Sequence, residues 1–134
     1  MYVSYKDLSG FYKLSKKEKE QQFKKDLQSI SRIKEHLIII KEYAKVYNES
    51  NGLYRDMAFD AINVHIQAFT EFSVKVSNPF QWDHTPMLPW KALRKLRNIL
   101  SHRYYLMNDN IVNLVVDHID GFISNIDDVL NKYK

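Results

Sequence analysis

Apolar residues recur every three or four positions over most of this chain, and no segment shows the alternation of a strand. The first long pattern ends just before Asn51-Gly52, a pair that stops helices. Its apolar positions are Phe23, Leu27, Ile30, Ile33, Leu37, Ile40, Ala44 and Tyr47. Ser15 and Glu18 have the spacing of a capping box, which predicts that a helix begins beside them.

The second pattern, from about Leu53 to Val76, is apolar on two sides. One side carries Phe59, Ile62, Ile66, Phe69 and Val76, and the other carries Ala58, Ala61, His65, Ala68 and Phe72. A helix of this kind lies in the centre of a bundle or at a subunit interface. We expect His36 at the surface of its helix and His65 as a hydrogen-bonded core histidine.

A short third helix is predicted from about Pro89 to His102 or Arg103, because proline suits a first helical turn. Asn108 or Asp109 can cap a last helix that continues to the C-terminus. Four main helices with short links predict an all-α fold, an up-and-down bundle. We divide the chain into a basic N-terminal segment, residues 1–25, and a helical domain, residues 26–134.

Composition restricts the class of protein further. With 134 residues, of which 45% are hydrophobic and 27% charged, the chain suits one soluble domain with a real core. It has no cysteine, which excludes disulfides and thiolate metal sites. Neither a signal peptide nor a membrane span is visible, so we expect a cytoplasmic protein. Asp83-His84 lacks further ligands at suitable spacing, so we expect no metal and no cofactor.

The charge of the chain is unevenly distributed. Residues 1–25 contain seven lysines and three acids, residues 91–103 contain five basic residues and no acid, and residues 109–128 contain five acids and no lysine or arginine. A basic strip on an otherwise balanced domain suits an anionic partner such as RNA. A merely solvated helix face explains the strip equally well.

Candidate chemistry is concentrated in the third helix. Asn98 and His102 lie one turn apart, whereas Arg97 and His102 are five residues apart, about 140° around a straight helix. Both can reach one substrate only if the helix ends near His102 or if a second copy of the chain supplies one of them. Alternatively, Arg97 and His102 simply place positive charge at a helix C-terminus, where cations are favoured.

The segment Arg97-Asn98-Ile99-Leu100-Ser101-His102-Arg103-Tyr104 resembles the Arg-x4-His-x-Tyr motif of HepT-type (DUF86) HEPN ribonuclease toxins. The preceding Leu88-Pro89-Trp90-Lys91 resembles the Pro-Trp approach of that family. The resemblance covers roughly residues 26–132. The family usually has a Gly-Glu-Ala in its second helix, which we align with Ile66-Gln67-Ala68, so that Gln67 replaces the acid.

The resemblance implies a metal-independent endoribonuclease that acts on tRNA or mRNA. His102 would transfer protons, since histidine titrates near neutral pH, and Arg97 would stabilise the phosphoryl oxygens. Asn98 would orient His102 or donate to phosphate. The residues expected to hold the RNA backbone are Lys91, Arg94, Lys95 and Arg103. HEPN proteins form a dimeric cleft, so the resemblance also implies a homodimer that supplies two copies of Arg97 and His102.

The same resemblance implies a partner. HepT toxins are paired with a minimal nucleotidyltransferase antitoxin that attaches AMP to the motif tyrosine, which corresponds to Tyr104, with Tyr105 as an adjacent phenol. One alternative is a non-catalytic HEPN-type binding partner of a nucleotidyltransferase. Another is a helical interaction protein whose basic helix docks an acidic partner.

Overall fold

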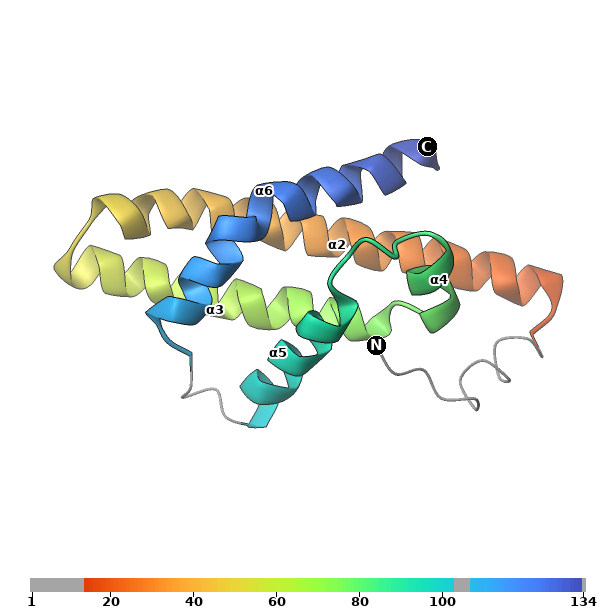
Figure 1. Ribbon diagram of the computed structural model, residues 1–134, viewed down its shortest axis with the longest axis horizontal. Coiled ribbons are helices and arrows are strands. Elements are labelled where there is room, and N and C mark those ends of the chain that lie inside the picture. The colour runs from red at the N-terminus through yellow and green to blue at the C-terminus, as the bar shows by residue number, and fades with distance from the viewer. Residues whose placement is uncertain (1–13, 103–106, 134) are drawn as a thin grey trace.

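The protein is all-helical, as the spacing of its apolar residues predicts. A computed structural model describes residues 14–102 and 107–133, and this part of the chain forms five helices and no strand (Figure 1). They are α2 (Lys16–Glu49), α3 (Gly52–Lys75), α4 (Asn78–Asp83), α5 (Trp90–His102) and α6 (Asp109–Lys132). Four of them match the main helices expected from the sequence, and α4 is a short addition within the predicted linker.

The start of α2 is fixed by the expected capping box. Ser15 Oγ accepts the backbone N–H of Glu18 at 3.1 Å, and the Glu18 carboxylate accepts the backbone N–H of Ser15 at 3.3 Å. The helix then continues without interruption through residues 25 and 26, where we divided the chain. The turn into α3 uses Gly52 at φ 62°, a left-handed conformation that glycine adopts without strain.

The core lies where α2 packs along α3 and α6 crosses the pair, mainly over α2 (Figure 1). Its buried apolar residues include Ile30, Ile33, Leu37, Ile40, Ile62, Ile66, Phe69, Val112 and Ile126. Helix α5 packs against α3 rather than against α2 or α6. The candidate motif therefore lies on a helix at the edge of the bundle.

Polar contacts hold the segment between α3 and α5 in place. Buried Asp26 accepts the backbone N–H of Ser77 at 2.9 Å and its hydroxyl at 2.6 Å. Burial raises the pKa of Asp26, and these hydrogen bonds oppose the rise. Further along, Trp90 Nε1 donates to the carbonyl of Thr85 at 2.8 Å. The start of α5 is thus tied to the linker.

Candidate active site

Helix α5 presents its apolar side to α3 and its polar side outward. Trp90, Leu93 and Leu100 are buried. The exposed residues include Lys91, Lys95, Asn98 and His102, which recur at intervals of four, three and four. On an α-helix these positions fall within about 60° of one another, so they form one polar stripe. We call these four residues the α5 stripe.

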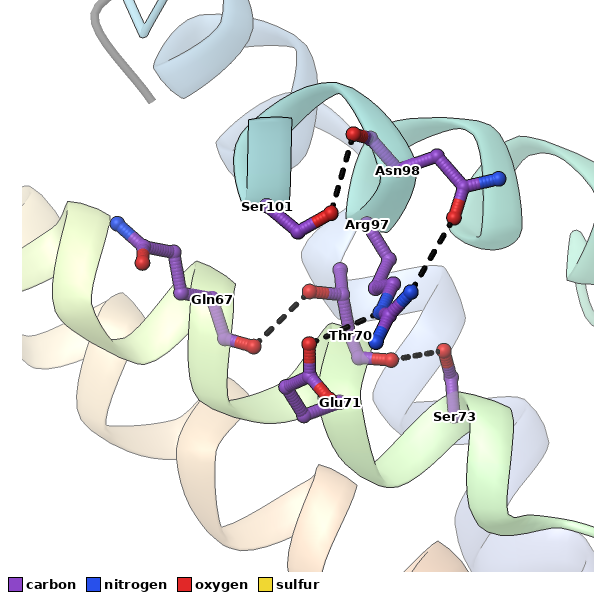
Figure 2. A network of polar contacts seen from close by, with 7 residues as sticks. All are labelled: Gln67, Thr70, Glu71, Ser73, Arg97, Asn98 and Ser101. Carbon is purple, nitrogen blue, oxygen red and sulfur yellow. Dashed lines mark hydrogen bonds and ion pairs between the residues drawn. The ribbon is translucent and has the colours of Figure 1, made fainter. Parts of the chain in front are cut away.

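Arg97 lies off this stripe, about 100° around the helix from Asn98, and turns toward α3. Its Nε donates to Glu71 Oε1 at 2.9 Å, and its Nη1 donates to Asn98 Oδ1 at 3.4 Å (Figure 2). A guanidinium has five N–H donors, so these two contacts leave most of its outer edge available for an anion. Glu71 thereby binds one edge of the Arg97 guanidinium. The other edge, the fork formed by the two terminal nitrogens, has the geometry that suits a phosphate.

Gln67, which we aligned with the family's acid, forms its hydrogen bond within its own helix. Its side chain points away from Arg97 and donates to Asn63 Oδ1 at 2.9 Å (Figure 2). Glu71, one turn further along α3, supplies the carboxylate instead. The chain therefore has an acid against the motif arginine, and the sequence analysis did not single out this acid.

His102 is the last residue of α5 and is exposed. No described residue forms a hydrogen bond with its ring. Arg97 and His102 belong to one continuous helix, so the rotation of about 140° between them applies. Of the other motif residues, Arg103, Tyr104 and the neighbouring Tyr105 lie outside the described part of the chain.

A groove of about 320 Å³ opens beside Arg97, between α3 and α5. Its lining includes Val64, Glu71, Thr70, Arg97 and Ser101. Thr70 and Ser101 direct their hydroxyls to backbone carbonyls of their own helices, at 2.9 and 3.2 Å (Figure 2). Arg97 is the cationic group of the groove. We call this space the Arg97 groove.

Metal-ligating residues do not gather in residues 14–102 and 107–133: no cluster of three or more His, Asp or Glu side chains could hold an ion there. His84 instead contacts the Tyr133 hydroxyl at 2.5 Å through Nδ1 and packs against Phe23. In the same ranges, each helix is too short or too polar to cross a membrane.

Comparison with known proteins gives one finding. A sequence model of the family described as ribonuclease HepT-like matches residues 6–129. Searches of curated proteins and of solved structures give no match. The matched range contains all of α2, α3, α4 and α5, and with them both Arg97 and Glu71.

Proposed function

Because the chain belongs to the HepT-like ribonuclease family, we propose that it is a metal-independent endoribonuclease that uses Arg97 and His102. The observation that carries the proposal is the contact between Arg97 and Glu71. It holds the guanidinium at a groove with the outer edge turned to solvent. An arginine that only joined two helices would be more stable with hydrogen-bond acceptors at both edges of its guanidinium.

The reaction follows from the groups that the site offers. A neutral imidazole of His102 takes the proton of a ribose 2′-OH, whose oxygen attacks the adjacent phosphorus. The bond from phosphorus to the 5′ oxygen breaks, and a protonated imidazole gives its proton to that oxygen. The products are a 2′,3′-cyclic phosphate and a 5′-OH. Arg97 stabilises the charge on the phosphoryl oxygens, and Asn98 orients His102 or donates to phosphate.

The reaction uses two imidazoles in different protonation states, and the motif of each chain supplies only one, so two chains are needed. Helix α3 offers an exposed face against which the second chain could pack. Leu53, Met57 and Val64 are 71%, 57% and 62% exposed, and they lie on the side of α3 that also carries Glu71. Val64 itself lines the Arg97 groove. Pairing two copies across this face would bury the apolar residues and bring a second motif to the same groove. The exposed α3 face therefore supports a homodimer with a shared cleft.

The RNA backbone would follow the basic side of α5. Lys91 and Lys95 are exposed on the α5 stripe, and Arg94 lies next to it. These residues, with Arg103, provide contacts to phosphates without reading sequence. The substrate we propose is tRNA or mRNA.

We further propose that the protein is the toxin of a toxin–antitoxin pair. A minimal nucleotidyltransferase antitoxin would attach AMP to Tyr104, two residues beyond His102. The added phosphate would compete with RNA for Arg97. A mass increase of one AMP on a peptide containing Tyr104, absent in Tyr104→Phe, tests this part; an increase that persists in Tyr104→Phe would move the site to Tyr105.

Purified parent protein and His102→Ala are incubated with total RNA in the presence of EDTA. The proposal expects cleavage by the parent alone and 2′,3′-cyclic phosphate ends. His102 is exposed and its ring forms no hydrogen bond with a described residue, so the variant is expected to fold normally. Equal cleavage by both proteins, or cleavage by the parent that EDTA abolishes, would reject the mechanism.

A further inference from the structure

A second groove lies at the opposite end of α5 from His102, where α4 and the linker meet the first turns of α5. Its volume is about 590 Å³. Trp82 and Gln81 line it from α4, and Lys91 and Lys95 line it from α5. The two lysines are the charged residues of this lining. We call it the Trp82 groove.

The two tryptophans of the chain differ in a way that points to this groove. Trp90 is 6% exposed and its indole N–H is bound to Thr85. Trp82 is 46% exposed, and its indole N–H has no acceptor among the described residues. Trp90 therefore contributes to the core, whereas Trp82 leaves an aromatic surface at the groove. Gln81 is buried beside it, and no described donor reaches its Oε1.

Lys91 and Lys95 lie one turn apart on the same side of α5. Like charges at this spacing destabilise a helix. Three described lysines pair with an acid, namely Lys34 with Asp127, Lys41 with Asp120 at 2.7 Å and Lys45 with Glu42 at 3.5 Å. No acid in residues 14–102 or 107–133 pairs with Lys91 or Lys95. An anion held between the two ammonium groups would relieve their repulsion.

The α5 stripe connects this groove with the motif. Lys91, Lys95, Asn98 and His102 follow one side of the helix, and the axial rise from Lys95 to His102 is about 10 Å. That distance suits a short single strand, because stretched nucleotides each span several ångströms. A strand bound at the motif can therefore continue along the stripe into the Trp82 groove.

We propose that the Trp82 groove binds one nucleotide of single-stranded RNA, with its base stacked on Trp82 and its phosphate between Lys91 and Lys95. This inference rests on the proposed function and adds a requirement to it. A base can stack on an aromatic side chain only when it is unpaired and unstacked from its neighbours. The protein would therefore select single-stranded regions of RNA and disfavour duplexes.

RNA binding is measured separately from cleavage by using the full-length His102→Ala variant. Tryptophan emission is followed while oligoadenylate is added, alone or annealed to oligouridylate. The single strand is expected to quench Trp82 in a saturable way, and the duplex is expected to quench it far less. Trp90 also lines the groove but is only 6% exposed, so most of the quenching is expected at Trp82, and Trp82→Leu in the same protein should remove most of it.

Affinity is then measured from the anisotropy of labelled oligoadenylate. Trp82→Leu is expected to weaken binding by about 5- to 150-fold, the range for loss of one stacked base, and Trp82→Phe is expected to weaken it much less. Met87→Ala is the matched control, because Met87 is 52% exposed in the same linker region but does not line the groove. Replacing Lys91 and Lys95 by glutamine should reduce the slope of log affinity against log salt by about 0.7 for each phosphate that the protein no longer neutralises.

Unchanged affinity in Trp82→Leu, or equal quenching by single strand and duplex, would overturn the inference. Because these experiments need no cleavage, they separate the two proposals. A protein that cleaves RNA but shows no effect at Trp82 keeps the proposed function and loses this subsite. Strand binding that depends on Trp82, in a parent protein that cleaves no RNA, keeps the subsite and loses the reaction.

Discussion

Arg55 and Arg97 each pair with an acid on another helix, and they do so differently. Arg55 and Arg97 are similarly exposed, at 38% and 34% of their side chains. Arg55 Nη2 donates to the Tyr47 hydroxyl at 2.8 Å and lies 3.5 Å from Asp109, and its guanidinium covers the Tyr47 ring at 4.1 Å. The buried Tyr47 in turn donates to Asp109, so both the face of the Arg55 guanidinium and its Nη2 are occupied by this cluster.

Arg97 binds its acid through Nε, at the inner edge of the guanidinium. Its fork meets only the Asn98 oxygen, at the long distance of 3.4 Å, and opens on the Arg97 groove. Exposure therefore does not separate a structural arginine from a candidate catalytic one. The two arginines differ in the edge of the guanidinium that the acid occupies. Substitutions of Arg55 and Arg97 should therefore have opposite effects on stability and on RNA cleavage.

The largest effect is expected from Arg97→Ala on RNA cleavage. Loss of a group that stabilises developing charge lowers kcat by about 10²–10³-fold. The free energy of unfolding should change by less than about 1 kcal/mol, because exposed ion pairs contribute little. Single-turnover cleavage and urea unfolding of the same preparation measure both quantities. A variant that cleaves normally would remove Arg97 from the mechanism.

Arg55→Ala should give the reverse result. It leaves the Tyr47 hydroxyl and Asp109 without their cation and is expected to lower the free energy of unfolding by about 1–3 kcal/mol. The cleavage rate per folded molecule should equal that of the parent. Tyr47→Phe, which removes one hydroxyl from the same cluster, is the control for stability. Loss of cleavage in fully folded Arg55→Ala would contradict the division between the two arginines.

Glu71 is expected to act as a positioning residue through Arg97. Glu71→Ala frees the guanidinium and should lower kcat by about tenfold with little change in KM, since misplacement of a catalytic group slows the chemical step. Glu71→Gln keeps an acceptor for Arg97 Nε and should recover part of the loss. In the Arg97→Ala background, Glu71→Ala should have no further effect. Additive effects of the two substitutions would show that Glu71 acts elsewhere.

The smallest effect is expected at the pair of histidines between α2 and α3. His36 Nδ1 and His65 Nδ1 are 2.9 Å apart, and burial, with the nearby His65, lowers the pKa of His36. A histidine with a folded pKa below its unfolded value stabilises the fold above about pH 6.5, and this stability is lost as the pH falls. The free energy of unfolding should therefore decrease from about pH 7 to about pH 5, and less so in His36→Gln. An equal decrease in both proteins would assign it to other groups.

The helices could be predicted closely from the sequence, because local signals fix them. The capping box at Ser15 and Glu18 and the stop at Gly52 lie within a few residues of the elements they bound. Helix α4 was missed because six residues are too few to show a helical period. The hydrogen bond of His65 was expected, but its partner His36 lies 29 positions away and has no local signature.

The site could be predicted in part, since α5 carries the motif within a few turns. Glu71 was not singled out from the sequence, because Gln67 and Glu71 lie one turn apart on the same side of α3. Periodicity cannot tell such residues apart, and only the packing of α5 on α3 decides which of them meets Arg97. The exposure of Trp82 likewise depends on how α4 lies against the start of α5.

The central claim is that Arg97 of one chain works with His102 of a second. Arg97→Ala and His102→Ala are unfolded in urea, mixed, refolded together and tested for RNA cleavage, beside each variant and the parent refolded alone. We predict that the mixture regains a small but measurable fraction of parent activity, because mixed dimers hold an intact Arg97 and an intact His102 from different chains, although they keep only one of the two imidazoles that the mechanism uses. The gain should disappear when both variants also carry Met57→Glu, which lies on the same α3 face but does not line the Arg97 groove. A mixture no more active than the sum of its two components, beside an active refolded parent, would contradict the shared cleft.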